Sequence, residues 1–378
     1  MKLRDMKTAE ERRAAIEKET GVKLKHVAEY AFDEEVVMKK NIENLIGATQ
    51  VPLGVAGPLT VNGVKRLVPL ATTEGALVAS VNRGCTAIEK AGGVTAIVLE
   101  DRMTRSSLFV VDGIVKGKEF VDWVDSHFEE IAAHAEEGSR FLKVKKIKRW
   151  IIGRNIYLRF ECFTGDAMGM NMVTIGVHQA SEWIAGETGA EYLSASANLC
   201  VDKKAAAINM IEGRGKTVLA EVFLPDKVIK DVLKTDSDRL VDLAYRKNML
   251  GSAQAGSYGF NMHVANVIAA MYIALGQDAA QSVNGSIGFS LFERVKGGVH
   301  ASLKLPALEV GTVGGGTCLP AQREALEMVG VAGSGEPAGG NAVRLAEIIC
   351  AACLAGEVSG MAAQASHQLA RAHKELGR

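Results

Sequence analysis

The stretch that decides the fold runs from residue 107 to residue 163. It divides into four pieces: SLFVVDGIV (107–115), EFVDWVDSHFEEIAAHAEE (119–137), RFLKVKKIKRWIIG (140–153) and NIYLRFECF (155–163). The first, third and fourth pieces have the composition of strands, whereas the second has the apolar spacing of an amphipathic helix. A further helix is expected after Asp166. The order strand, helix, strand, strand, helix predicts a small split βαβ, or ferredoxin-like, domain.

The sequence on either side of this stretch has a different pattern. Residues 8–40 predict a helix, and residues 41–63 are rich in Gly and Pro and predict turns. A helix is expected from Thr73–Glu74 to Ile88, ended by Gly92–Gly93. After residue 217 the chain is predicted to be mostly helical, with glycine-rich breaks at 251–259 and 311–317.

We therefore expect an α+β fold in which a small domain is inserted into a larger α-rich domain. The expected boundaries are an N-terminal helical segment (1–40), a large domain in two parts (41–105 and 194–378) and the small domain (106–193).

Composition favours a soluble globular protein. The 378 residues include 44 Lys and Arg against 44 Asp and Glu, so no polyanion partner is indicated. The most apolar run, Leu345–Ala363, carries Glu347 and Glu357 and is expected to be a buried helix instead of a membrane span. The charged N-terminus lacks the apolar stretch of a secretory signal. Absence of both features favours a cytoplasmic protein.

The cysteines and the missing motifs narrow the chemistry. Six cysteines are scattered along the chain, so reduced thiols are expected. Cys350 and Cys353 form a C-x-x-C in an apolar helical pattern, which favours core packing over redox chemistry. The chain has no G-x-G-x-x-G, H-E-x-x-H or G-x-S-x-G, and IEGRGKT carries Met210 where a P-loop needs its first Gly. No metal site is expected.

Several segments could carry chemistry, and each also has an ordinary structural interpretation. Glu74, at a predicted helix start, could simply cap that helix. Lys203, within DKK (202–204), could belong to a solvated loop or act as an electrostatic clamp. Asp278 follows a buried apolar helix, and DAMGMN (166–171) and GTVGGGT (311–317) could let a ring or a phosphate approach the backbone or be packing and turn segments.

Taken together and in order, these segments resemble the 3-hydroxy-3-methylglutaryl-coenzyme A (HMG-CoA) reductase family. The motifs are ENLIGATQVPLGVAGPL (43–59), TTEGALVAS (72–80), DAMGMN, DKK with IEGRGK (211–216), GQDAAQ (276–281) and GTVGGGT. The pattern is similar to the class I form, without the membrane anchor of the animal enzymes. The resemblance covers nearly the whole chain from about residue 41.

The resemblance implies that HMG-CoA is reduced to mevalonate and free coenzyme A by two successive hydride transfers from NADPH. Hydride addition to a thioester builds negative charge on oxygen, which a Lys ammonium stabilises best in a dry site. A Glu can then supply a proton, and a His can protonate the departing thiolate. Asp278 near both Lys203 and Glu74 would couple their titrations.

Site residues follow by motif. The implied catalytic residues are Glu74, Lys203, Asp278 and His373. The implied cofactor-binding residues are Ser139, Arg140, Asp166, Met168, Gly169, Met170, Asn171, Gly314 and Thr317, with the Ser139–Arg140 pair reading the 2′-phosphate of NADPH. The implied substrate-binding residues are Arg105, Ser196, Asp202, Lys204, Lys247, His263 and Asn266.

The resemblance also implies a homodimer, or a dimer of dimers, with the active site between subunits. Two departures from the family stand out. Ala197 replaces the Gly of the Ser-Gly-Asn that precedes DKK, and no Ser follows His373, so the regulation by phosphorylation found in animal enzymes is not expected. Two alternatives stay open: oxidative, NAD-dependent degradation of mevalonate, against which Arg140 argues, and a non-catalytic CoA-binding scaffold.

Overall fold

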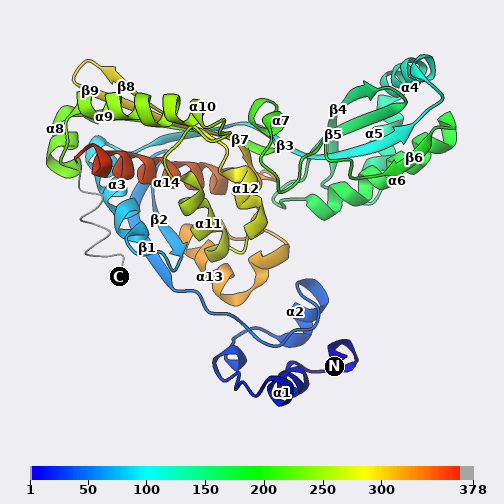
Figure 1. The fold of residues 1–378 in the computed structure, drawn as a ribbon, viewed down its shortest axis with the longest axis horizontal. Helices are drawn as coiled ribbons and strands as arrows, with labels where there is room; N and C mark the ends of the chain where they lie inside the picture. Colours follow the sequence, from blue (N-terminus) through cyan, green and yellow to red (C-terminus); the bar gives the residue numbers. More distant parts are fainter. Residues whose placement is uncertain (1, 367–378) are drawn as a thin grey trace.

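The structure, a computed structural model, describes residues 2–366. It has three parts: a small domain that extends like an arm, a large central domain, and an N-terminal lobe that projects from the large domain and contacts it at Gly315 and Leu319 (Figure 1). Three separate hydrophobic cores correspond to them, a large one, one within residues 103–190, and a minor one around Ala9, Val37 and Leu45. His367 and His373 lie outside the described residues.

The small domain has the predicted order of elements. They are the second half of β3 (Thr95–Val110), α4 (Ile114–Ser126), α5 (Phe128–Glu136), β4 (Lys143–Ile152), β5 (Asn155–Phe163), α6 (Met170–Thr188) and β6 (Glu191–Ser194). The strands lie in the order β4-β5-β3-β6, all antiparallel, which is the arrangement of a split βαβ sheet. The single helix expected over 119–137 is divided in two at His127.

Strand β3 belongs to both domains. Its residues 95–102 pair with β7 (Gly215–Pro225), and its residues 103–110 pair with β5. The strand therefore runs from the large domain into the arm (Figure 1). In the large domain the sheet continues through β9 (Gly298–Leu308) to β8 (Phe289–Val295).

Helices and a hairpin complete the large domain. The hairpin is β1 (Leu53–Val61) with β2 (Val64–Ala71). The helices are α3 (Leu77–Ala91), α7 (Ala207–Ile211), α8 (Asp226–Val228), α9 (Ser237–Ala244), α10 (Ser252–Gln254), α11 (Val264–Ala274), α12 (Ser282–Gly285), α13 (Pro320–Val329) and α14 (Gly340–Ala365). Gly92 ends α3 in the left-handed conformation, as predicted, although the helix begins at Leu77 and not at Thr73.

Helix α14 is the central helix of the large domain. By length and composition it could cross a membrane, but 94% of its most apolar window is buried inside the protein. It crosses α3 so closely that a Cβ on Gly84 would lie 1.9 Å from the carbonyl oxygen of Ala355. Cys350 and Cys353 are buried in this helix as free thiols, in agreement with the packing interpretation. Burial raises the pKa of Cys350, which keeps the thiol protonated.

Three features differ from the sequence prediction. The helix expected over 8–40 is broken into α1 (Ala9–Thr20) and α2 (Glu34–Lys40), because Gly21 ends the first in the left-handed conformation and Asp33 caps the second. The hairpin β1–β2 begins within the segment predicted to be turns. Strands β7, β8 and β9 lie in the region predicted to be mostly helical, so that prediction is wrong for these segments.

Candidate active site

Lys203 lies on a loop whose backbone conformation is unusual. Asn198, Val201 and Lys203 all have positive φ angles, of 59°, 46° and 57°, which non-glycine residues adopt rarely and at a cost. The Lys203 ammonium lies 2.8 Å from Oδ2 of Asp278. Asp278 in turn accepts a hydrogen bond from the backbone N–H of Ala280, at the start of a short 3₁₀ helix. The predicted pairing of Lys203 with Asp278 is therefore present in the structure.

The neighbouring Asp202 is held from the interior of the protein. Its Oδ1 accepts a hydrogen bond from Gln281 Nε2 (2.7 Å) and lies 3.1 Å from Nη1 of Arg214. Its Oδ2 faces Arg105 at 3.8 Å. Asp202 and Arg105, both expected at the substrate site, thus lie together on the Lys203 side.

Glu74 lies elsewhere in the chain. Its Oε1 accepts a hydrogen bond from Nδ2 of Asn266, 3.1 Å away, in the first turn of α11. Asp278 follows the other end of the same helix, and the eight steps from Asn266 to Ala274 span roughly 12 Å at 1.5 Å per residue. Within one chain, the expected grouping of Asp278 with both Lys203 and Glu74 is therefore met for Lys203 and not for Glu74.

Other predicted substrate residues gather near Glu74, around a buried carboxylate. Glu357, from the middle of α14, accepts hydrogen bonds from the backbone N–H groups of Met262 and His263 and lies 3.5 Å from Nδ1 of His263. Burial lowers the pKa of Lys247, and the Glu357 charge opposes this shift, so Lys247 also lies near the buried carboxylate. Glu74, Asn266, His263 and Lys247 thus form one group, and Arg105, Asp202, Lys203 and Asp278 form another.

The two remaining predicted substrate residues make local contacts on the loop before Lys203. Lys204 donates a hydrogen bond to Oδ1 of Asn198 (2.7 Å), and the backbone N–H of Ser196 donates to Oγ of Ser194. Both side chains are exposed and free to turn toward a ligand.

The two motifs assigned to the cofactor lie side by side. Ala167 pairs with Val313, and the backbone N–H of Thr312 donates to the carbonyl of Asp166 (2.8 Å). A Cβ on Gly311 would lie 2.4 Å from the Met168 nitrogen, so only Gly allows this approach. Gly169, within the DAMGMN motif, is in the left-handed conformation just before α6, which begins at Met170. The amino end of a 19-residue helix therefore lies next to a glycine loop, an arrangement that attracts anions.

Three further residues predicted to bind the cofactor lie around the amino end of α6 and the glycine loop: Gly314, Thr317 and Asn171. Among residues 2–366, no heavy atom lies within 4 Å of the position that a Cβ on Gly314 would take, so this part of the structure leaves the loop open there. The Thr317 hydroxyl donates to the Gly314 carbonyl (2.6 Å) and fixes the loop. Asn171 is exposed in the first turn of α6.

The Asp166 carboxylate is already saturated within the protein. Oδ2 accepts from the backbone N–H groups of Gly335 and Gly339, and Oδ1 from those of Asn341 and Ala342, all at 2.9 Å. Asp166 thus caps the start of α14. Its carboxylate has no accepting capacity directed at a cofactor, so its part is to fix the loop that carries Met168 to Asn171.

The Ser139–Arg140 pair lies close to the same loop. The Ser139 hydroxyl accepts from the backbone N–H groups of Phe141 and Leu142, and the Arg140 guanidinium lies 4.6 Å from the centre of the Phe141 ring. Phe141 is also within 4 Å of the position that a Cβ on Gly165 would take. An exposed cation is thus placed beside the predicted cofactor loop.

Strand β4, which follows Arg140, carries five Lys and Arg residues, and three of them lie against carboxylates. Lys143 contacts Glu136, Lys148 lies between Glu161 and Glu212, and Arg149 contacts Asp125. Because β4 lies at the edge of the sheet, these ion pairs lie along a strand edge.

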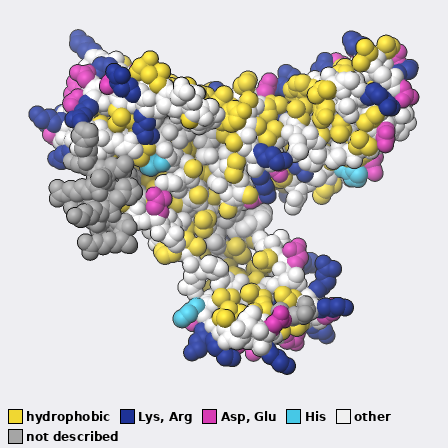
Figure 2. Space-filling view, in the orientation of Figure 1, with side chains coloured by type: hydrophobic (Ala, Val, Ile, Leu, Met, Phe, Trp, Pro, Cys, Tyr) yellow, Lys and Arg dark blue, Asp and Glu magenta, His cyan; other side chains and the backbone are white. Residues whose placement is uncertain are grey.

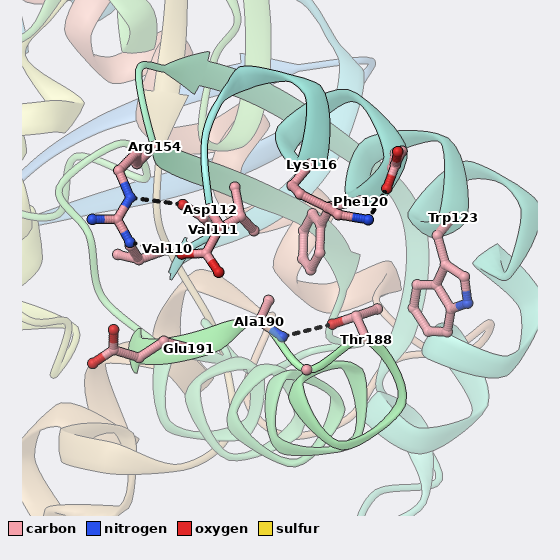
Figure 3. Close-up of a pocket in the computed structure, with 12 residues that line it drawn as sticks. Val110, Val111, Asp112, Lys116, Phe120, Trp123, Arg154, Thr188, Ala190 and Glu191 are labelled. Carbon is pink, nitrogen blue, oxygen red and sulfur yellow. Dashed lines mark hydrogen bonds and ion pairs between the residues drawn. The ribbon is translucent and has the colours of Figure 1, made fainter.

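A pocket in the arm involves none of the predicted site residues. It lies between α4, the end of β3 and the turn before β6, and Lys116, Trp123, Arg154 and Glu191 are among its lining residues (Figure 3). Two of its charged side chains are paired locally, Lys116 with Glu119 and Arg154 with Asp112.

Sequence reasoning missed two buried charged residues next to the Lys203 loop. Arg214 and Glu309 are fully buried and lie 2.7 Å apart. Burial raises the pKa of Glu309 to about 7, against the opposing effect of Arg214. Arg214 lies in the IEGRGK motif, which gave a signal for the family but none for a partner 95 residues away.

Comparison with known proteins identifies the family of the chain. The family model described as "Hydroxymethylglutaryl-coenzyme A reductase" matches residues 8–378. Relatives named 3-hydroxy-3-methylglutaryl-coenzyme A reductase include one from Pyrococcus horikoshii, 50% identical over 97% of this chain and 91% of the relative. Another, from Methanocaldococcus jannaschii, is 48% identical over 97% of this chain and 92% of its own. A plant relative from Gossypium hirsutum is 44% identical over all of this chain and 66% of its own.

Among solved structures, the class II HMG-CoA reductase from Streptococcus pneumoniae bound to NADPH has the same fold. The TM-score is 0.72 at 18% sequence identity, and the match covers 95% of this chain and 97% of that one. The family model matches most of the chain, and relatives near 50% identity match it over almost their whole length. The chain therefore belongs to the hydroxymethylglutaryl-coenzyme A reductase family.

Proposed function

We propose that this chain reduces (S)-HMG-CoA to mevalonate and free coenzyme A with two molecules of NADPH, and that Lys203, Asp278, Glu74 and His373 carry the reaction. Membership of the reductase family supports the reaction. The observation that carries the assignment of residues is the Lys203–Asp278 pair, with 2.8 Å between the ammonium and the carboxylate on a loop that also orients Asp202.

The proposed roles follow from these contacts. Lys203 is partly exposed, with 43% of its side chain accessible, so its ammonium can reach the substrate oxygen that becomes negative while Asp278 holds its position. Glu74 donates a proton to that oxygen, and Asn266 orients the Glu74 carboxyl. His373, beyond the described residues, protonates the coenzyme A thiolate as it leaves. Arg105, Ser196, Asp202, Lys204, Lys247 and His263 bind the carboxylate and hydroxyl of the substrate.

The residues around α6 fit a dinucleotide phosphate. When bound, NADPH supplies the hydride. The amino end of α6 and the open loop at Gly314 offer backbone N–H groups to its phosphates, and Arg140 offers a bidentate fork to the 2′-phosphate. The dinucleotide-binding unit is the small domain, 106–193; the substrate-binding unit comprises 41–105 and 194–378; and residues 1–40 form a separate segment. The three hydrophobic cores support this division.

The class I form is favoured by sequence identity. Archaeal and plant relatives are 44–50% identical to this chain, whereas the class II structure is only 18% identical. A cytoplasmic location is part of the same proposal, since α14, which is apolar enough to span a membrane, is instead buried in the large domain.

The active site is shared between two copies of the chain. Lys203 with Asp278, and Glu74 with Asn266, lie at opposite ends of α11, so a second subunit must bring the missing half to each site. The N-terminal lobe projects from the large domain, and hydrophobic side chains are exposed on the lobe and along the arm (Figure 2). Ile97, Leu99 and Phe223 are also about half exposed on strands of the large sheet. These surfaces are suited to a homodimer or a dimer of dimers.

The first experiment tests the reaction. NADPH absorbance should fall when HMG-CoA is added, with two NADPH consumed for each substrate and mevalonate as product. Activity with NAD⁺ and mevalonate alone would favour the oxidative alternative, and binding of coenzyme A without turnover would favour a scaffold.

The second experiment tests the shared site by complementation. Glu74→Ala and Lys203→Ala are each expected to be inactive. Co-expressed, they form mixed dimers in which one of the two sites has both residues intact, so about a quarter of wild-type activity should return for random pairing. No recovery in mixed dimers of confirmed composition would place both residues in one subunit. A fully active monomer in sedimentation would exclude the dimer.

A further inference from the structure

Arg214 contacts two parts of the proposed site from inside the protein: the loop that carries Lys203 and the start of α6. Its guanidinium, fully buried just before β7, reaches four groups besides Glu309. Nη1 lies 3.1 Å from Oδ1 of Asp202 and 3.4 Å from Oε1 of Gln281. Nε donates to the Thr104 hydroxyl on β3, and Nη2 lies 2.9 Å from Sδ of Met170, at the start of α6. One side chain thus contacts both the Lys203 loop and the start of the helix assigned to the cofactor.

The loop that carries Lys203, with its left-handed residues, is held by hydrogen bonds from buried polar side chains. Val201, one of its left-handed residues, presents a carbonyl that accepts hydrogen bonds from Asn209 (2.9 Å) and Asn284 (3.0 Å). Asn284 also donates to Glu309 Oε1, the oxygen that faces Arg214. A left-handed conformation in Val persists only where surrounding groups determine it. Arg214 and Glu309 stand at the centre of the groups that do so.

We propose that Arg214 is a positioning residue for the reductase reaction, which sets the loop carrying Lys203 relative to the first turn of α6. It does not touch substrate; it acts through Asp202 and Met170. The Glu309 carboxylate balances the charge of the Arg214 guanidinium in the core and orients it. The inference rests on the proposed function, because the position it fixes matters only if Lys203 and α6 serve one reaction.

The test distinguishes a role of Arg214 in positioning the Lys203 loop from a role only in neutralising the buried charge of Glu309. Arg214→Met leaves Glu309 buried without a counter-charge and should lower the melting temperature. The double variant Arg214→Met, Glu309→Met removes both charges, and replacement of a whole buried pair by apolar residues is often tolerated. We expect the double variant to recover most of the melting temperature while kcat stays about 100-fold below wild type, the size of loss that a displacement near 1 Å can cause.

If the double variant recovers kcat together with stability, Arg214 serves only to pair Glu309 and the proposal is wrong. Arg159→Met is the matched control: Arg159 is also fully buried, pairs with Glu161 at 3.3 Å, and donates to the Gly213 carbonyl. It should lose stability but keep kcat, measured below its melting temperature, within a few-fold of wild type. A kcat loss in Arg159→Met as large as in the double variant would also overturn the proposal.

Arg214→Lys covers the case in which the double variant does not fold. It keeps the charge beside Glu309 but cannot reach Asp202, Thr104 and Met170 at once. We expect it to fold, with kcat lowered and the Kd for NADPH raised, and wild-type values of both would overturn the proposal. Absence of turnover in the wild type would instead refute the proposed function, so the two failures are distinguishable.

Discussion

Replacement of Asp166 by Asn is the sharpest test of how the cofactor loop is fixed. The Asp166 carboxylate accepts four backbone hydrogen bonds at 2.9 Å, from Gly335, Gly339, Asn341 and Ala342. Asn has the same shape but only one accepting oxygen, and its NH₂ group would face two N–H donors. Two hydrogen bonds to a charged acceptor are therefore lost, at about 1.5–3 kcal/mol each, or roughly 3–6 kcal/mol in total.

Such a loss is a large part of the stability of a typical domain. Urea denaturation of Asp166→Asn should show a free energy of unfolding lower by that amount, and the Kd for NADPH should rise because the loop and the start of α6 are held less firmly. Asp112→Asn is the control, since Asp112 is exposed and contacts only Arg154 among the interactions found for it. A change below about 1 kcal/mol in Asp166→Asn would refute the reasoning, because it would mean that the four contacts contribute little.

Four further outcomes are expected. Burial raises the pKa of Glu309 to about 7, so the protonated side chain is favoured in the folded chain. The stability that this confers is fully present below the unfolded pKa near 4.5 and is lost as pH rises through 7. Urea denaturation from pH 5 to 8 should show wild type losing about 2–3 kcal/mol relative to Glu309→Gln, and a constant or opposite difference would contradict this. Gly84→Ala should lower the free energy of unfolding by about 2–3 kcal/mol, because the new Cβ meets the Ala355 carbonyl, whereas Gly186→Ala, in an open position on α6, should not; equal effects would exclude the close crossing. Arg140→Ala should raise the KM for NADPH far more than that for NADH, with Lys145→Ala as control, and equal losses would remove Arg140 from phosphate recognition. His373→Gln should slow reduction of HMG-CoA and spare that of free mevaldehyde, and similar losses on both would contradict its role toward the thiolate.

The small domain could be predicted from sequence because its elements are short and clearly patterned. Residues 155–163 and 143–152 are rich in β-branched and aromatic residues, and both form strands. The hairpin β1–β2 was missed because Gly54, Gly57 and Pro58 favour turns. The pairing of β1 with β2 shifts register between Ala56 and Leu59, so an irregularity accommodates these residues within a strand.

For the site, the sequence motifs predicted some contacts, but not those that depend on how distant segments meet in space. The pairing of Lys203 with Asp278 was expected from motifs and is present, but the position of Glu74 near Asn266 depends on the path of α11 in space. The contacts of Asp166 with residues 335–342 could not be read from local sequence, because nothing in DAMGMN indicates which distant N–H groups it meets. Arg214 and Glu309 were missed for the same reason.

Strand β3 has a consequence for how ligands enter and leave. Because one continuous strand carries ladders in both sheets, its partner changing between Arg102 and Met103, the arm cannot swing freely from the large domain without twisting a hydrogen-bonded backbone at that junction. For the proposed reaction we therefore expect ligand entry and release to depend on shorter segments at the edges of the site, while the continuous strand β3 keeps the spacing between the two domains.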